Sequence, residues 1–254
     1  MMNFTLSNQV QIPAVGIGTF MMTPDQAEQA VVDALACGYR MIDTAQAYMN
    51  ERAVGRGIKR SGVAREDIFI STKIWASQYL TEGTVEKSLE LLGTDYIDLM
   101  FIHQPAGDFM AGYRKLETVA IRPMVNQIEM HPYFAQESAL KVMEEYQIVP
   151  EAWAPLGGGR HNPFDNEMVK EIAAAHGKTV GQVDLRWNVQ RGVVVIPKSV
   201  HKARIEENFQ IWDFTLTEEE MQKISSLDLG YQGTAVKHFD PEFVKMCNIR
   251  KIHE

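Results

Sequence analysis

Short apolar, β-branched segments alternate with amphipathic helical patterns along the whole chain. We expect strands at residues 14–18, 39–42, 68–72, 97–102, 123–128, 149–154 and 193–197. No linker rich in proline, glycine or serine and no low-complexity block interrupts this alternation. The pattern therefore predicts an α/β protein in which crossover helices join parallel strands, and a single domain over residues 1–254.

Local signals support individual elements. The segment 23–38 has a helical period, with Thr23 placed to cap its start and Gly38 placed to end it. The segment 4–16 reads as an N-terminal hairpin ahead of the first parallel strand.

Composition excludes several classes of protein. With 254 residues, 45% of them hydrophobic, the chain is long enough for a large core, and its formal charge of −8 argues against a nucleic-acid-binding or anionic-membrane surface. Cys37 and Cys247 lie in no disulfide or zinc-binding pattern. No uncharged apolar run reaches the roughly 18 residues that span a bilayer. We expect a cytoplasmic protein, soluble and without a membrane segment.

Three successive predicted strands end on titratable residues at regular spacing. Asp43, Lys73 and His103 follow the strands at 39–42, 68–72 and 97–102, and Tyr48 lies five residues after Asp43. One such residue is commonly only the start of a solvated loop. Three in register favour a site, because the carboxyl ends of barrel strands gather on the face where barrel enzymes place their chemistry.

The four side chains suit proton donation to a carbonyl oxygen. A tyrosine, with a pKa of about 10, is a poor acid unless a cation stabilises its phenolate. Lys73 can do so, Asp43 can hold the lysine charged, and His103 can hydrogen-bond a substrate carbonyl. These residues contain no metal-ligand set, which disfavours a metal-dependent hydrolase. Reduction also needs a hydride that side chains do not supply, so a cofactor is implied.

A basic cluster follows the last predicted strand. Lys198, Lys202 and Arg204 lie at the start of a predicted helix, whose N-terminal amides favour an anion. The alternative is a solvated basic turn.

Seven ordered motifs cover almost the whole chain. They are GIGTF at 16–20, YRMIDTAQAYMNERAVG at 39–55, ISTKIW at 70–75, DLMFIHQP at 98–105, VNQIEMHPY at 125–133, AWAPLGGG at 152–159 and VIPKSVHKARIEENFQIWDFTL at 195–216. Together they resemble the aldo-keto reductases, and in particular the bacterial members that reduce diketogluconate, methylglyoxal and other small carbonyls. The resemblance implies a TIM (β/α)8 barrel that reduces carbonyls with NADPH. Tyr48 would be the general acid, Lys73 and Asp43 would tune its pKa, and His103 would orient the substrate.

The resemblance also implies the binding residues. Gln127 would bind the nicotinamide carboxamide, Trp153 would stack on the nicotinamide ring, and Leu156 would line the pyrophosphate. The remaining cofactor residues would be Gly18, Thr19 and Asp43, then Lys198, Ser199, Val200 and Arg204 at the 2′-phosphate, and Glu207 and Asn208 at adenine. Phe20 and Trp75, with His103, would contact substrate. The tail after Gly230, with Tyr231, His238 and Phe239, is a candidate lid or a plain surface tail.

The sequence departs from the family between residues 117 and 124. Seven strands are predicted where the family has eight, and the fifth βα unit, with its Gly-Val-Ser-Asn-Phe motif, has no counterpart. Either the sequence omits residues that the natural protein contains, or the chain truly lacks the unit. Two unpaired strand edges would be costly in a barrel, and this favours the first explanation.

The sequence therefore predicts NADPH-dependent reduction of aldehydes and small ketones, such as dicarbonyls and keto sugars, by a monomer. The alternative is a non-catalytic NADPH-binding or oligomeric remnant, left by loss of the fifth unit. A substrate of this kind is a small molecule, and no nucleic-acid, membrane or metal partner is expected.

Overall fold

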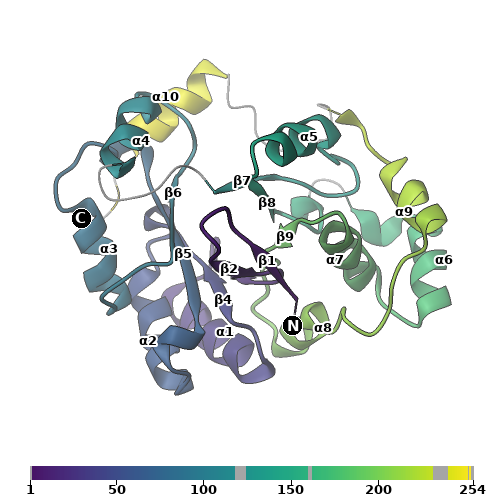
Figure 1. The fold of residues 1–254 in the computed structure, drawn as a ribbon. Helices are drawn as coiled ribbons and strands as arrows, with labels where there is room; N and C mark the ends of the chain where they lie inside the picture. Colours follow the sequence, from purple (N-terminus) through teal and green to yellow (C-terminus); the bar gives the residue numbers. More distant parts are fainter. Residues whose placement is uncertain (1, 118–123, 160–161, 231–239, 251, 253–254) are drawn as a thin grey trace. The chain divides into compact units, whose positions relative to one another are not determined.

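A computed structural model of the chain describes residues 2–117, 124–159, 162–230, 240–250 and 252. The chain divides into two compact units (Figure 1). The four-strand unit comprises Ile17–Arg122, Ser199–Lys202 and Val236–Glu254. The three-strand unit comprises Met1–Gly16, Pro123–Lys198 and Ala203–Ala235. Each unit is described by itself.

The four-strand unit is built on a parallel sheet in the order β3-β4-β5-β6. Its strands are β3 (Ile17–Gly18), β4 (Met41–Asp43), β5 (Phe69–Ile74) and β6 (Leu99–Ile102). Its helices are α1 (Pro24–Cys37), η1 (Gln46–Tyr48), α2 (Glu51–Ser61), η2 (Arg65–Asp67), η3 (Ala76–Gln78), α3 (Thr84–Leu92), α4 (Phe109–Glu117) and α10 (Pro241–Ile249).

The first helix forms as its sequence predicts. Thr23 accepts a hydrogen bond from the Gln26 amide, and the Gln26 side chain accepts one from the Thr23 amide, which completes a capping box. Gly38 ends α1 with a φ of 112°, a conformation that costs other residues strain. Ala27, Val31 and other apolar residues of one face are buried.

Neighbouring strands of this sheet differ in burial. All six residues of β5 are buried, whereas all four residues of β6 are only half-buried. In the part of the chain that the structure describes, β6 has β5 as its one strand neighbour and forms the edge of the sheet. The apolar sequence of β6 is nevertheless typical of a strand covered on both sides.

The three-strand unit holds a parallel sheet in the order β7-β8-β9 and an antiparallel hairpin of β1 and β2. The strands are β1 (Asn3–Thr5), β2 (Gln11–Pro13), β7 (Val125–Glu129), β8 (Val149–Trp153) and β9 (Val194–Val195). The helices are α5 (Glu137–Glu145), η4 (Gly157–Gly159), η5 (Pro163–Asp165), α6 (Glu167–His176), α7 (Val180–Gln190), α8 (Lys202–Phe209) and α9 (Glu218–Ser225). Val15 adds a parallel bridge to Val195.

The core of the three-strand unit lies among α6, α7 and α9. Trp187 of α7 is fully buried there, and its indole nitrogen donates to Ser225 Oγ over 3.1 Å. Tryptophan buries a large apolar area, and this bond satisfies its single donor.

The predicted α/β class and N-terminal hairpin are confirmed. The strands differ in their ends, because pairing rather than hydrophobicity sets them: β4 includes Asp43, and β5 continues through Lys73 to Ile74. The described parallel strands form sheets of four and three, and no closed barrel is seen among them. The connection at 118–123 and the residues Tyr231, His238 and Phe239 lie outside the described residues.

Candidate active site

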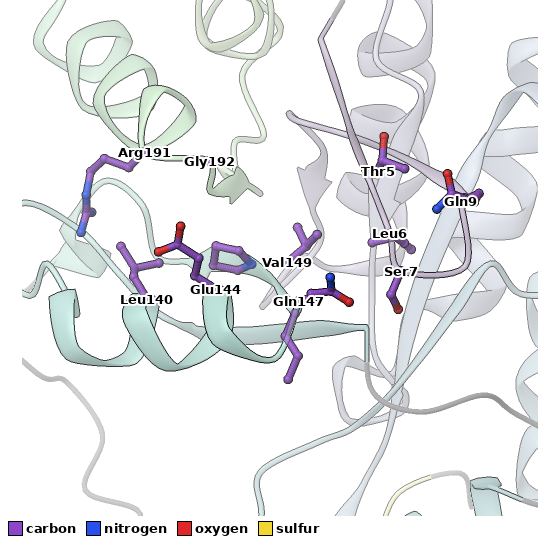
Figure 2. A pocket seen from close by; sticks show the side chains of 12 residues that line it. Thr5, Leu6, Ser7, Gln9, Leu140, Glu144, Gln147, Val149, Arg191 and Gly192 are labelled. Atoms are coloured by element: carbon purple, nitrogen blue, oxygen red, sulfur yellow. The ribbon is translucent and has the colours of Figure 1, made fainter.

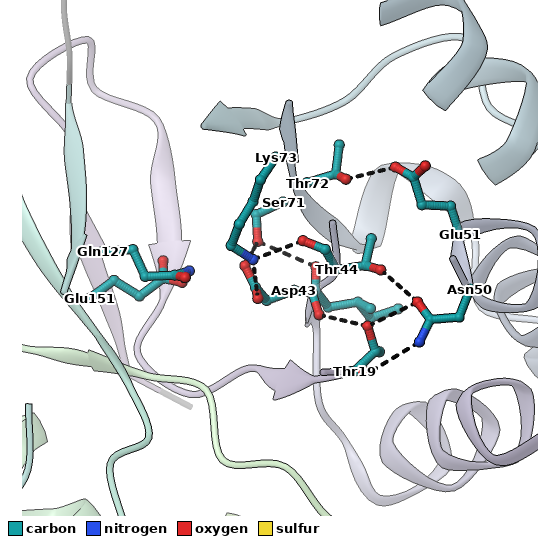
Figure 3. Close-up of polar contacts among 11 residues, drawn as sticks. Thr19, Asp43, Thr44, Asn50, Glu51, Ser71, Thr72, Lys73, Gln127 and Glu151 are labelled. Carbon is teal, nitrogen blue, oxygen red and sulfur yellow. Dashed lines mark hydrogen bonds and ion pairs between the residues drawn. The ribbon is translucent and has the colours of Figure 1, made fainter. Parts of the chain in front are cut away.

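The carboxyl ends of β4 and β5 bring a lysine and an aspartate together inside the four-strand unit (Figure 3). Lys73 Nζ donates to Asp43 Oδ1 over 2.5 Å and to the Thr44 carbonyl over 2.8 Å. Both charged side chains are only 2% exposed. A buried ion pair of this kind is held in one geometry, because either partner alone would be an uncompensated charge.

Asp43 is fixed by further contacts. Ser71 Oγ, opposite it on β5, donates to Asp43 Oδ2 over 2.9 Å, and Thr19 donates from both its amide and its hydroxyl to the Asp43 carbonyl. The Asn50 amide group donates to the Thr19 and Met22 carbonyls, and its oxygen accepts from the Thr44 hydroxyl (Figure 3). Lys73 and Ser71 therefore hold the carboxylate of Asp43, and Thr19 holds its backbone.

Tyr48 ends the short helix η1 beside this ion pair. Lys73 Nζ lies 5.1 Å from the centroid of the Tyr48 ring, and the ring packs edge-on against Phe20 at 5.1 Å and His103 at 5.7 Å between centroids. Tyr48 is half-buried, so its ring is held while remaining partly accessible. The structure thus brings together all four residues predicted to be catalytic.

His103 follows β6, and its amide donates to the Ile74 carbonyl over 2.9 Å. Burial, then the charge of Lys73, then that of Arg250 hold the pKa of His103 well below its usual value, so the imidazole is neutral. The predicted substrate residue Trp75 packs edge-on against it, with 5.0 Å between ring centroids. Among the residues that the structure describes, His103 Nδ1 and Trp75 Nε1 are buried polar atoms without a hydrogen-bond partner.

A second polar layer lies behind β5, and sequence reasoning did not identify it. Thr72 Oγ1 donates to the buried carboxylate of Glu51 over 2.7 Å, and burial raises the pKa of Glu51. Gln46 accepts from the Trp75 amide and donates to Thr84 of α3. Gln46, Asn50 and Glu51 all lie in the polar stretch after β4, which was the only available signal.

The predicted nicotinamide residues lie in the three-strand unit. Gln127 of β7 is paired in register with Glu151 of β8, and its side chain donates to the buried Glu151 carboxylate over 2.6 Å. Trp153 ends β8, and Leu156 follows it. The three glycines of η4 come next, all with positive φ, a conformation that suits glycine.

The predicted phosphate residues flank the start of α8. Lys198 and Arg204 are exposed, and Ser199 Oγ accepts from the His201 amide over 3.1 Å. Val200 is half-buried. The two predicted adenine residues are more constrained: Asn208 is buried, and Glu207 accepts a hydrogen bond from Thr179 over 2.9 Å. Gly18 and Thr19 lie in the other unit and are both buried.

A pocket of about 570 Å³ lies elsewhere in the three-strand unit (Figure 2). The β1–β2 turn, the end of α5 and the start of β8 line it, together with Arg191 and Gly192. None of the predicted site residues does so. Because barrel enzymes place their chemistry at the carboxyl ends of strands, this pocket at the amino end of β8 is not the candidate active site.

No described helix is long and apolar enough to cross a membrane. Within the described ranges, no three His, Cys, Asp or Glu side chains gather in a way that could hold a metal ion.

Comparison with known proteins agrees with this geometry. The model of the Aldo/keto reductase family matches residues 14–119 and 110–229. The 9,11-endoperoxide prostaglandin H2 reductase of Trypanosoma cruzi is 42% identical, with 88% of this chain and 90% of that protein aligned. The glyoxal reductase of Bacillus subtilis is 41% identical, with 88% and 91% aligned.

A solved structure shows the same likeness in three dimensions. MGS-M4, an aldo-keto reductase enzyme from a Medee basin deep-sea metagenome library, aligns with a TM-score of 0.89 at 37% identity. The alignment covers 93% of this chain and 98% of that one. Sequence motifs, site geometry and these matches agree, and the chain belongs to the aldo/keto reductase family.

Proposed function

We propose that this oxidoreductase reduces aldehydes and small ketones, including dicarbonyls and keto sugars, with NADPH, and that Tyr48 is its general acid. The observation that carries the proposal is the buried Lys73–Asp43 pair beside the Tyr48 ring and the neutral His103. This arrangement has an acid, a cation to stabilise its conjugate base, and a neutral hydrogen-bond donor for a carbonyl oxygen.

Each residue has a distinct part in the proposed reaction. The nicotinamide cofactor, when bound, supplies the hydride that reduces the carbonyl carbon. Tyr48 gives its phenolic proton to the carbonyl oxygen, and the Lys73 ammonium stabilises the phenolate that remains. Asp43 holds Lys73 charged and in place. His103 donates a ring N–H to the same oxygen and fixes its angle.

The donor set fits an anionic dinucleotide. Lys198 and Arg204 are exposed cations at the start of α8, whose first amides also favour phosphate. Such cations suit the extra 2′-phosphate of NADPH. Gln127 and Trp153 would hold the nicotinamide, and Leu156 would line the pyrophosphate. The adenosine end would be held by Ser199, Val200, Glu207 and Asn208. The remaining proposed cofactor residues are Gly18, Thr19 and Asp43.

Replacing the two cations tests this cofactor preference. In Lys198→Ala and Arg204→Ala, we expect NADPH affinity to fall about tenfold or more, because each loses a charged contact worth about 1.5–3 kcal/mol. NADH affinity should barely change, because NADH lacks the 2′-phosphate. Fluorescence titration with both cofactors measures this, and equal losses for the two would contradict a 2′-phosphate site.

We further propose a single barrel domain whose sequence has no counterpart of the fifth βα unit, and omission of residues that the natural protein contains stays the favoured explanation. The alignment with the trypanosomal reductase runs over 257 positions, more than the 254 residues of this chain, although only part of the chain is aligned. The family model also matches in two segments that overlap at 110–119, near the expected position of the unit. The half-buried edge strand β6 supports the same proposal. Among the described residues neither Cys37 nor Cys247 is in a disulfide, and this suits a cytoplasmic enzyme, which we expect to be a monomer.

A shortened barrel leaves the non-catalytic or oligomeric remnant as the competing function. Oxidation of NADPH in the presence of methylglyoxal, followed at the nicotinamide absorbance, separates the two. We expect a kcat of roughly 1–1,000 s⁻¹, the range usual for enzymes. On size-exclusion chromatography we expect a single species of monomer size. Binding of NADPH without any turnover would favour the remnant.

A further inference from the structure

The C-terminal helix α10 contacts the loops that follow three neighbouring strands of the four-strand unit. Arg250, which caps the end of α10, reaches Ala47 after β4 and Ser77 after β5, and Asn248 of α10 reaches Gly107 after β6. A Cβ atom at Gly107 would lie 2.4 Å from Asn248 Oδ1, so the helix packs closely on the loop after His103. These loops carry the proposed acid, the substrate-side tryptophan and the neutral histidine.

Arg250 makes the contacts nearest to these residues. Its Nη2 donates to the Ala47 carbonyl over 2.9 Å, and Ala47 directly precedes Tyr48. Its guanidinium carbon lies 5.3 Å from the centroid of the Trp75 ring, within the range of a cation–π contact. Its own carbonyl accepts from Ser77 Oγ over 3.0 Å. One residue therefore links the helix end to the backbone before Tyr48 and to the Trp75 ring.

Apolar packing fixes the helix beneath these polar contacts. Cys247 and Ile252 are buried in one cluster with Ala47 and Trp75, and Tyr48 packs against it. Arg250 caps this packed helix, and its amide donates to the Met246 carbonyl, although the residue itself is exposed. An arginine whose side chain is held by such contacts can keep neighbouring groups in place, whereas a mobile surface arginine cannot.

We propose that Arg250 is a positioning residue of the carbonyl-reducing site, which holds the backbone before Tyr48 and the indole of Trp75 in their working places. The inference rests on the proposed function. In this role, α10 supports the loops that carry the site. Loss of Arg250 should slow the chemical step rather than weaken cofactor binding, because its contacts are with Ala47, Trp75 and Ser77.

The test uses the full chain with Arg250→Gln, and with Lys245→Gln as a matched control that removes one exposed positive charge from the helix that Arg250 caps. With methylglyoxal and saturating NADPH, we expect kcat in Arg250→Gln to fall between about 10-fold and about 100-fold, as displaced reacting groups cost. The dissociation constant of NADPH should stay unchanged, and Lys245→Gln should match the parent in both. Millimolar guanidinium ion should restore part of the activity of Arg250→Ala.

The inference would be overturned if Arg250→Gln had the same kinetics as Lys245→Gln, or if Arg250→Gln lost kcat and NADPH affinity equally. It would also be overturned if guanidinium ion did not restore activity to Arg250→Ala. If the parent chain shows no turnover, the proposed function fails separately. Positioning is then read from Trp75 emission, taken as the difference from Trp75→Phe. An unchanged Trp75 emission in Arg250→Gln would also overturn it.

Discussion

Each unit buries an aspartate, and the two aspartates differ in their hydrogen-bond partners. In the four-strand unit, Asp43 accepts from Lys73 and Ser71. In the three-strand unit, Asp184 of α7 is fully buried, and neither of its carboxylate oxygens has a hydrogen-bond partner among the described residues. Asn188, one turn later, has a buried oxygen in the same state within those residues.

The difference distinguishes a buried carboxylate that can serve in a functional site from one that only destabilises the fold. A carboxylate that is paired and hydrogen-bonded can stay ionised in a low-dielectric interior, and its geometry is then pre-organised for chemistry. A carboxylate without partners responds by holding its proton, and burial indeed raises the pKa of Asp184 well above its usual value. Burial of a polar residue alone therefore does not identify a functional site, whereas its partners do.

The largest effect on stability should come from breaking the buried Lys73–Asp43 ion pair. Lys73→Met leaves the Asp43 carboxylate buried at 2% exposure without its cation. We expect the free energy of unfolding to fall by about 3–5 kcal/mol, as is usual when one partner of a buried pair is removed. Urea denaturation followed by circular dichroism measures the change.

Lys59→Met is the matched control, because Lys59 is exposed on α2. It removes the same charge, and it should change stability by less than about 0.5 kcal/mol. Similar losses in both variants would show that the Lys73–Asp43 pair is not special.

Replacement of Asp184 should have a smaller effect, and it should increase stability rather than decrease it. Asp184→Leu replaces a buried carboxyl without described partners by an apolar side chain of similar size. We expect the free energy of unfolding at neutral pH to rise by about 1–3 kcal/mol, the cost of an unsatisfied buried polar group. A loss of stability on denaturation would mean that Asp184 has a partner that matters.

The pH dependence gives a second reading of Asp184. Its folded pKa is raised, so the folded state keeps a proton that the unfolded state releases above about pH 3.9. Stability from this residue therefore falls as pH rises from about 4 to the folded pKa, by at most about 1.4 kcal/mol per pH unit. Asp184→Leu should remove that fall, and an identical pH profile in both proteins would contradict the assignment.

Sequence patterns predicted the strands and the four-residue cluster, because strand spacing alone puts Asp43, Lys73 and His103 at neighbouring strand ends. They did not predict the supporting contacts. Asn50 reaches Thr19 across 31 positions, and Arg250 reaches Ala47 across 203. Such contacts depend on tertiary packing that no local period records. The half-burial of β6 and the orphaned carboxylate of Asp184 were hidden for the same reason, since both lie in stretches that read as ordinary core.

In the proposed reaction, Tyr48 delivers the proton to the carbonyl oxygen. The most direct test of this role is the single-turnover rate of NADPH oxidation by methylglyoxal in the parent chain and in Tyr48→Phe, together with the dissociation constant of NADPH. We predict a rate loss of at least about 100-fold, the contribution usual for a general acid, with unchanged NADPH binding, because the phenol contacts no phosphate. A rate in Tyr48→Phe close to that of the parent chain would show that Tyr48 is not the general acid.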